Sequence, residues 1–551
     1  MRNDIMREYV LNDYLLFGTR GHNHLLAAAQ KAFALANGAS DASTLIELGA
    51  RLFCMAWAEF PLNSPLAGEV VKLYDRIPLV RQLLTPYSLA VAKRISRSGH
   101  GDGSVEASEY FLQGRYAELD ENLMHSARGE MVLPVARQAM LYQGLLSKWD
   151  WLEGFIQRIV APVEPEVAEL LLAEVLLAHG KCKAAVRVYE SLLERFGISI
   201  VGLNLATAYA GTGEKDKALA LLQEVLREFP LHTSALLLMD SLAFPANRDV
   251  RLEGKCVVSI YSYNKADELA RTLESVLASD LSEQVGDISI KVLVNGSEDG
   301  SLDVVKAAQA RFDGILDVVD LPVNVGAPAA RNWLIDAAWK DKAEWIVFLD
   351  DDVIVPHDWL RGFAAGTEEF PDAGVWGCHV RDAVSPSITQ HADGFVLCRE
   401  DAAKQGGRVV LHEPSTECLI PLQANYRRYA SSVTGCCHLF RLEELRQRKG
   451  FDLLFSPSQF DDLDLDLRML QDGKPAAYLG DVDIRHLRLS NHLRAQSEEA
   501  ERQSCNHRQL LEDRHDKHLE SILNTQFSYI REDIAAKRER LQRAGLLPVE
   551  M

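Results

Sequence analysis

The sequence predicts a helical repeat region in the first half of the chain, an α/β domain with a mixed, mainly parallel sheet in the second half, and a helical C-terminal tail. Two observations predict this organisation. A turn-like motif recurs every 33 residues in the first half, and after Gly254 short β-branched segments alternate with helical ones. A chain of 551 residues is too long for one hydrophobic core, so several domains are expected.

Composition narrows the possible partners. With 47% hydrophobic and 25% charged residues the chain is typical of soluble globular proteins. Its formal net charge of −20 argues against nucleic acid or an anionic membrane as a partner, because both need a positive surface. Small phosphorylated ligands remain compatible with this charge.

The cysteines and the hydropathy pattern predict a cytoplasmic protein without a transmembrane segment. The nine cysteines form no CxxC pair, which is typical of a reducing compartment. Residues 1–16 contain acids and lack the features of a signal peptide, and no stretch reaches the ~18 apolar residues of a membrane helix.

The first helical region is predicted over residues 1–95. Ala and Leu recur there at three- and four-residue spacings, and Gly38 and Pro61 follow two such segments. The glycine- and serine-rich stretch Ser96–Ser104 is predicted to be a linker.

The second helical region is predicted over residues 106–245. Gly114, Ser147, Gly180 and Gly213 begin similar motifs 33 residues apart, which predicts stacked helical hairpins. The last two units match best and resemble tetratricopeptide repeats, although the usual length of that repeat is 34. Such stacks offer a concave surface for a polypeptide; a scaffold that only supports the rest of the chain is the alternative.

The α/β domain is predicted over residues 254–490, and the helical extension over residues 491–551. Four continuously apolar segments are expected to be strands of a parallel sheet with both faces covered: 256–263, 288–295, 315–321 and 344–349. Ligands of such sheets bind at the carboxyl ends of the strands.

Asp350, Asp351 and Asp352 directly follow the fourth predicted strand. Neighbouring carboxylates repel one another unless a divalent ion neutralises them, and that ion can hold a diphosphate. The tripeptide therefore predicts a metal site, although acids after a strand are also common as solvated turns or helix caps.

Six segments in order resemble the inverting family 2 glycosyltransferases with a GT-A, Rossmann-like fold. The Asp350–Asp352 triplet stands where that family has its Asp-x-Asp motif. The other five segments are 258–264 with its Tyr and Asn, 292–301, the Ala-Arg-Asn segment within 324–338, 433–441, and 450–473 with its paired acids.

The resemblance assigns donor-binding roles. It places Tyr261 and Asn264 near the nucleotide base and ribose, and it places Asp350 and Asp352 at the ribose and the metal, with Asp351 between them. Asn295 stands where many members have an Asp that reads the base, so a nucleotide other than a uridine nucleotide is also compatible.

Arg331 has two alternative roles. It lies in the Ala-Arg-Asn segment, on a helix predicted to start near Pro328, and it could reach a phosphate. A structural pairing with a nearby acid is the alternative.

The resemblance also assigns a base. An inverting transfer needs a carboxylate that removes the proton of the acceptor hydroxyl, and Asp462 aligns with that base. Asp461, directly before it, is a candidate for the acceptor side. The surrounding leucines fit a helix and also alternate as in a strand. If the segment is a helix, acids at its start are favoured by the dipole whatever their function.

Three further residues complete the predicted site. His486 matches a position where GT-A enzymes have a histidine near the metal or diphosphate, which suits Mn²⁺ better than Mg²⁺; a structural histidine is the alternative. Trp376 and His379 are candidates for the acceptor side, although a core position is the commoner one for a tryptophan.

The resemblance and the repeats together imply a metal-dependent, inverting glycosyltransferase with a nucleotide-diphosphate sugar as donor, UDP-sugar first among them. The repeats imply a protein acceptor, for example flagellin, by analogy. A glycosyltransferase of surface polysaccharide or a lipid-linked glycan is one alternative. A non-catalytic repeat scaffold with a degenerate transferase domain is another, and a nucleotidyltransferase is disfavoured because no glycine-rich basic loop follows the first strand.

Overall fold

The structure is a computed structural model that describes residues 11–98, 103–312, 314–487 and 497–548. The chain divides into two compact units, which are described separately. The first contains Met1–Ala243, Pro414–Gln423 and Ile534–Met551, and the second contains Phe244–Glu413 and Ala424–Asp533. The predicted absence of a signal peptide rests mostly on residues outside the described ones, and so does the centre of the predicted linker Ser96–Ser104.

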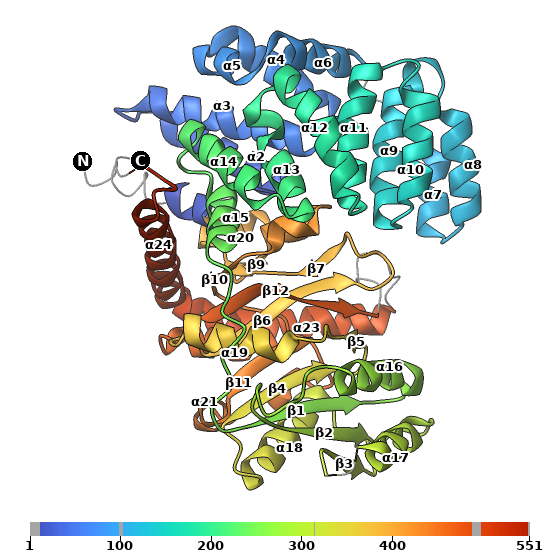
Figure 1. The fold of residues 1–551 in the computed structure, drawn as a ribbon, viewed down its shortest axis with the longest axis vertical. Coiled ribbons are helices and arrows are strands. Elements are labelled where there is room, and N and C mark those ends of the chain that lie inside the picture. The colour runs from blue at the N-terminus through green and yellow to red at the C-terminus, as the bar shows by residue number, and fades with distance from the viewer. Residues whose placement is uncertain (1–10, 99–102, 313, 488–496, 549–551) are drawn as a thin grey trace. The chain divides into compact units, whose positions relative to one another are not determined.

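The first unit is built from helices (Figure 1). The early part of the unit, predicted as helical, contains α2 to α6, and the repeat region contains α7 to α15. Their bounds are α2 His22–Ala36, α3 Ala42–Glu59, α4 Ser64–Arg76, α5 Pro78–Leu83, α6 Pro86–Arg97, α7 Val105–Leu112, α8 Tyr116–Ser126, α9 Val132–Leu145, α10 Trp149–Phe155, α11 Pro165–Ala178, α12 Cys182–Phe196, α13 Ile198–Thr212, α14 Lys215–Glu228 and α15 Thr233–Ala243.

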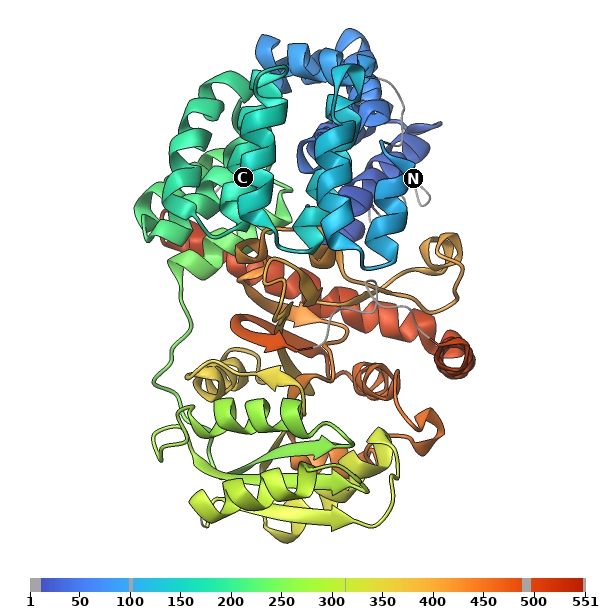
Figure 2. The ribbon, with the colours of Figure 1, turned by 90° about the vertical axis from the view of Figure 1, so that its right-hand side faces the viewer.

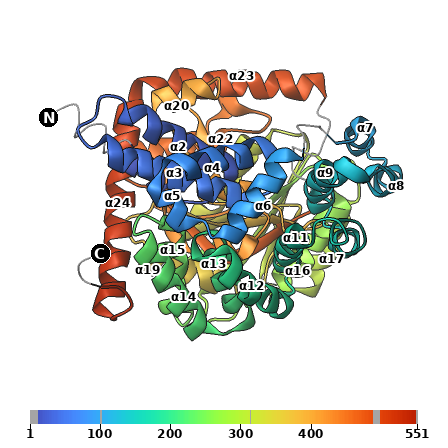
Figure 3. The ribbon, with the colours of Figure 1, turned by 90° about the horizontal axis from the view of Figure 1, so that it is seen from above.

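The predicted period corresponds to four helical hairpins, α7/α8, α9/α10, α11/α12 and α13/α14. Each of the four recurring positions lies in the turn inside a hairpin and has a positive φ, between 49° at Ser147 and 81° at Gly213. Glycine is favoured there because a side chain is strained in the left-handed region. Figure 3 views the unit from above and shows α11 to α14 side by side.

The segment Pro414–Gln423 belongs to the helical unit although it is far from it in sequence. Glu417 accepts a hydrogen bond from the backbone N–H of Asn23 (2.8 Å), in the first turn of α2, whose own N-cap residue Gly21 has no side chain to do so. At the other end Gln423 donates to Asn204 and Thr207 on α13. The segment therefore joins the beginning of the unit to its last repeat.

The second unit contains one large sheet and one small one. The bounds of the strands are β1 Lys255–Ser262, β2 Asp287–Asn295, β3 Leu316–Leu321, β4 Trp345–Asp350, β5 Val353–Ile354, β6 Val375–Asp382, β7 Thr389–His391, β8 Phe395–Val396, β9 Leu411–His412, β10 Arg427–Ala430, β11 Cys437–Arg441 and β12 Ala476–His486. The first four coincide with the predicted strands to within one residue.

The large sheet has the order β10-β12-β6-β11-β4-β1-β2-β3, with β5 on β12 and β7 on β6. Strands β1 to β4 pair in parallel, β6 and β12 also pair in parallel, and β11 runs antiparallel to both β4 and β6. The predicted fold class, helical repeats followed by a mixed, mainly parallel GT-A-like sheet and a helical tail, is confirmed.

Helices lie on both sides of β1 to β4, as Figure 2 shows. One core includes alternate residues of β1, β2 and β4 together with residues of α16 and α19, so one face of these strands is apolar and packs against the two helices. The helices of this unit are α16 Ala266–Leu277, α17 Ser301–Arg311, α18 Ala327–Lys340, α19 Trp359–Glu369, α20 Arg399–Lys404, α21 Leu442–Gln447 and α22 Asp461–Gln471.

The tail forms α23 Glu498–His515 and α24 Leu519–Arg543. At the end of α23, Arg514 and His515 contact the buried carboxylate of Asp464 on α22, at 2.7 and 2.9 Å. The start of the tail therefore covers the α/β unit. Within the described residues, every helix is too short or too polar to cross a membrane.

Candidate active site

The acid triplet lies where β4 ends, and its three carboxyl groups differ in exposure. Asp350 is the last residue of β4, and its side chain is 23% exposed. Asp351 and Asp352, in the following turn, are 5% and 1% exposed. Of the three, Asp350 is therefore the carboxylate most accessible to a ligand.

Lys265 neutralises the two buried acids. Its ammonium nitrogen lies 2.7 Å from Asp351 Oδ1 and 2.9 Å from Asp352 Oδ2. Burial raises the pKa of Asp351 to about 6 against the opposing effect of Lys265. Burial also disfavours the charged form of Asp352, but the hydrogen bond and charge of His486, together with Lys265, hold its pKa well below the usual range.

Sequence reasoning missed Lys265, although a signal was present. Tyr261 and Asp350 are register partners on the paired strands β1 and β4. Residues that follow one strand therefore meet residues that follow the other. A lysine shortly after β1 could have been matched to the acids after β4.

Tyr261 and Arg331 join the triplet to Asp461, the residue directly before the predicted base. The Tyr261 hydroxyl donates to Asp350 Oδ1 (2.9 Å), and the Arg331 guanidinium lies 5.1 Å from the centre of the Tyr261 ring. Arg331 is buried, forms an ion pair with Asp461, and is 3.8 Å from Asp350. Arg331 therefore has the acid partners that a structural role, the second of its two predicted roles, requires.

The segment around the predicted base is a helix, which settles the alternative left open by its leucine pattern. At the start of α22, Asp461 is 2% exposed, and burial raises its pKa to about 6 although Arg331 opposes this. Asp462 is partly exposed, and its Oδ2 accepts a hydrogen bond from the Gly435 N–H (2.8 Å). Asp462 is the more accessible of these two acids.

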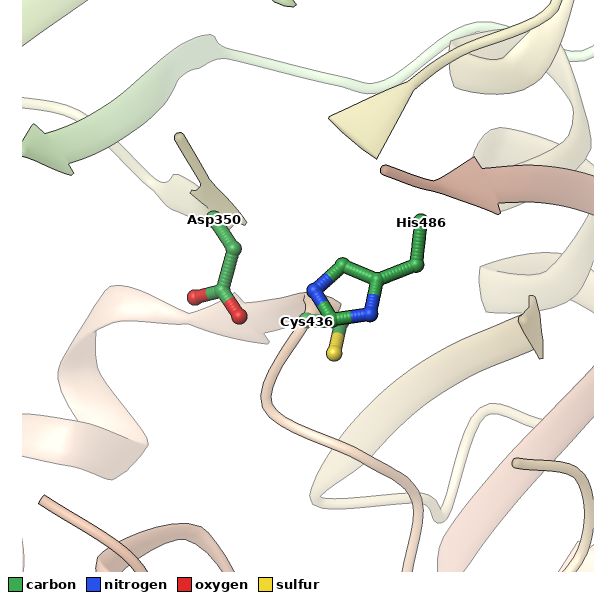
Figure 4. Close-up of side chains that lie close together, drawn as sticks. All are labelled: Asp350, Cys436 and His486. Carbon is green, nitrogen blue, oxygen red and sulfur yellow. The ribbon is translucent and has the colours of Figure 1, made fainter. Parts of the chain in front are cut away.

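His486, at the end of β12, completes a group of possible metal ligands. One ligand atom each of Asp350, Cys436 and His486 lies within 4.8 Å of the others (Figure 4), and His486 Nε2 is 3.0 Å from Asp352 Oδ1. Cys436 was missed as a ligand candidate. Burial, followed by the charge of Asp350, raises the pKa of its thiol well above the usual value, so it is a poor ligand before a metal binds.

The carboxylates and the imidazole that lie near Asp350 are suitable ligands for a divalent cation. Carboxylates outnumber the cations Lys265 and Arg331 in this region, because Asp350 to Asp352, Asp461 and Asp462 all lie there. Carboxylate oxygens with one imidazole suit Mn²⁺, whereas a thiolate would favour a softer metal such as Zn²⁺.

Comparisons with known proteins identify the two parts of the chain. The model of glycosyl transferase family 2 matches residues 257–442, and that of the tetratricopeptide repeat matches residues 201–232. Residues 257–442 are a family 2 glycosyltransferase domain. The repeat match covers most of α13 and all of α14. No curated protein has a sequence that matches this chain.

Several solved structures resemble parts of the chain at low identity. The structures are GalNAc-T7 with UDP, GalNAc and Mn²⁺ (13% identity, TM-score 0.33, 44% of this chain), the mannosyltransferase PcManGT from Pyrobaculum calidifontis with GDP-Man and Mn²⁺ (15%, 0.34, 63%), and TarS from S. aureus (16%, 0.31, 42%). The chain spans 46% of the GalNAc-T7 chain, 88% of PcManGT and 37% of TarS.

Two residues of the transferase domain that were predicted to bind the nucleotide-sugar donor stabilise loops through their side chains. Asn264 has a φ of 52° and accepts a hydrogen bond from the Glu298 N–H (2.8 Å). Asn295 donates to Asn324 and accepts from the Val325 N–H. Both side chains therefore stabilise the loops at the carboxyl ends of β1 to β3.

The structure does not place the predicted acceptor-side residues of the transferase domain at a surface. Trp376 is fully buried and donates its indole N–H to the Gly366 carbonyl (3.0 Å). His379 is 2% exposed and bonds Thr389, and Cys378 is also buried. Residues of β6 are buried on both faces of the sheet, so these side chains lie in the core of the unit, and their role toward an acceptor stays a prediction.

Proposed function

We propose that the chain transfers a sugar, with inversion, from a nucleotide-diphosphate donor to an acceptor hydroxyl. The observation that carries this proposal is the position of two accessible carboxylates: Asp350 lies within the segment that matches the family 2 glycosyltransferases, and Asp462 lies at the start of α22. Uridine diphosphate sugars are the first donors to test.

The chemistry needs one proton acceptor. The acceptor oxygen bonds the anomeric carbon from the face opposite the diphosphate, its proton passes to Asp462, and the bond from that carbon to the diphosphate oxygen breaks, with its electron pair leaving on the diphosphate. Asp461 is held in its ion pair with Arg331 and is not available for this role.

Asp350 and His486, with Asp352 beside them, would hold a divalent cation, Mn²⁺ or Mg²⁺. When bound, such an ion supplies positive charge that stabilises the departing diphosphate. Tyr261 and Arg331 fix the direction of the Asp350 carboxylate through the contacts described above.

We also propose that the acceptor hydroxyl belongs to a polypeptide. A tetratricopeptide-type repeat supports this proposal, because stacked helical hairpins commonly bind polypeptides. A transfer that proceeds onto a lipid-linked or free glycan and not onto any polypeptide would contradict it.

The test is turnover of a panel of nucleotide sugars by wild type and Asp462→Asn. We expect wild type to release nucleoside diphosphate and form the inverted anomer, and the variant to lose at least ~10³-fold in kcat while still binding nucleotide. Retention of configuration, or full activity of Asp462→Asn, would contradict the proposed mechanism.

A further inference from the structure

A chain of hydrogen bonds leads from a buried carboxylate to His486. Gln390 Nε2 donates to Asp382 Oδ2 (3.0 Å), and Gln390 Oε1 lies 2.8 Å from His486 Nδ1. The other face of the ring points at Asp352, with Nε2 3.0 Å from Oδ1. Asp382 and His486 are the last residues of β6 and β12 and are register partners, and Gln390 is the middle residue of β7.

Asp382 sets the direction of every bond in this chain. It is fully buried, and its Oδ1 already accepts the N–H groups of Val384 and Ser385, both at 2.8 Å. An ionised carboxylate only accepts hydrogen bonds, so Gln390 must turn its N–H₂ group towards Oδ2 and its carbonyl oxygen towards the ring. His486 Nδ1 must therefore carry a proton to donate to that oxygen.

A neutral imidazole has only one N–H. When that one proton is on Nδ1, Nε2 carries the lone pair and faces the carboxylates of Asp352 and Asp350. This is the tautomer in which the ring nitrogen beside the carboxylates can act as a metal ligand.

We propose that Asp382 and Gln390 are positioning residues that hold His486 in the tautomer whose Nε2 can bind the divalent cation. This inference rests on the proposed metal-dependent function. Partners behind a ligating histidine fix its tautomer and ring orientation in this way, and their loss typically costs 10–100-fold in metal affinity.

The substitution Asp382→Asn reverses the direction of these hydrogen bonds with almost no change in the shape of the side chain. The backbone N–H groups of Val384 and Ser385 still need an acceptor, so the side-chain oxygen of the Asn stays hydrogen-bonded to them. The N–H₂ group of the Asn then faces the N–H₂ group of Gln390. Gln390 then turns over and donates to Nδ1, and the ring proton moves to Nε2, where it blocks the cation. Gln390→Leu removes both bonds and leaves the ring orientation unspecified.

The experiment measures Mn²⁺ binding to the full chain, without nucleotide, by electron paramagnetic resonance of the free ion. We expect both variants to bind Mn²⁺ at least ~10-fold more weakly than wild type. Asp483→Asn is the matched control, because it removes the same charge from β12, three residues before His486, while its side chain pairs with Arg381. We expect that control to stay within ~3-fold of wild type.

The double variant distinguishes the proposed relay, which is the hydrogen-bonded series Asp382–Gln390–His486, from a general loss of structure. If both residues act through His486, Asp382→Asn has almost no further effect in the Gln390→Leu background. If the losses of Mn²⁺ affinity in the two single variants add up in the double variant, or if the variants bind Mn²⁺ as well as wild type, the proposed relay is wrong. Neither result would contradict the metal site itself. Failure of wild type itself to bind Mn²⁺ would overturn both the relay and the metal dependence.

Discussion

At the scale of single residues, one ammonium group balances two buried carboxylates where β4 ends. Lys265 contacts both Asp351 and Asp352, and neither contact involves the more exposed Asp350.

Lys265→Met tests the charge balance of the triplet. Without the ammonium group two buried carboxylates face each other, and removing one partner of a buried ion pair costs about 3 kcal/mol. We expect that loss in urea denaturation without metal, and partial recovery when Mn²⁺ is added. Lys340→Met, which breaks the exposed pair with Asp336, should change stability by less than ~1 kcal/mol. Equal effects of the two substitutions would show that Lys265 does not neutralise the two buried acids.

Asp350 and His486 could be placed in one site from the sequence because each ends a strand at the same edge of the sheet. Lys265 and Cys436 were missed because their importance depends on which chain segments meet. A single sequence does not contain the distances between segments.

The buried carboxyl group of Asp393 is expected to make the stability of the protein depend on pH. It is fully buried, and burial raises the pKa of its carboxyl to about 6 although Arg428 and Tyr426 oppose the rise. The folded state therefore keeps a proton that the unfolded state releases near pH ~4. The stability contributed by this proton is complete below pH ~4 and is lost as the pH rises through about 6.

Denaturation curves of wild type and Asp393→Asn between pH 4 and 7 measure this effect. The free energy of unfolding of wild type should fall relative to that of the variant by up to about 3 kcal/mol over this range. Parallel curves for the two proteins would show that Asp393 has an ordinary pKa.

At the scale of elements, strands β1 to β4 were predicted most accurately because each is a short segment rich in β-branched residues, and helical sequence separates most of them. The predicted and observed strands β1 to β4 differ by one residue at most. The segment 461–470 was ambiguous, because its leucines fit both periods; packing against α23 through Asp464 accompanies the helix that forms. Trp376 and His379 were predicted to lie on the acceptor side and are buried in the structure; their sequence could not decide, because an aromatic side chain suits both a sugar and a core.

Asp299 is expected to be the capping residue of two helices. Its Oδ2 accepts the Ala266 N–H at the start of α16, and its Oδ1 accepts the Ser301 N–H at the start of α17, both at 2.9 Å. Asp299→Ala should lower the free energy of unfolding by about 2 kcal/mol. Asp303→Ala, which removes an exposed acid from the first turn of α17, is the control and should cost ~0.5 kcal/mol or less. Similar losses for both would mean that only the helix dipole is involved.

At the scale of the whole molecule, the order of residues along the chain does not follow the compact units. The period of 33 residues revealed the helical hairpins, because a repeat can be seen in a single sequence. The membership of Pro414–Gln423 in the helical unit could not be predicted, because it depends on contacts between residues hundreds of positions apart.

Glu417→Ala tests the contribution of this segment. Loss of the carboxylate leaves the Asn23 N–H at the start of α2 without its acceptor, which should cost about 1 kcal/mol and speed amide hydrogen exchange in the first turn of α2. Asp41→Ala is the control, because Asp41 precedes α3 without making a capping hydrogen bond. Unchanged exchange in α2 would show that the segment does not support the helical unit.

The most direct test of the central claim is calorimetric titration of the full chain with nucleoside diphosphates, with and without Mn²⁺, on wild type and Asp350→Asn. The proposed site predicts binding of at least one nucleotide that requires Mn²⁺ and weakens at least ~100-fold in the variant, because Asp350 is the most accessible carboxylate of the triplet. If the folded wild type binds none of the nucleotides, or if Asp350→Asn binds them equally well, the proposed donor site is wrong.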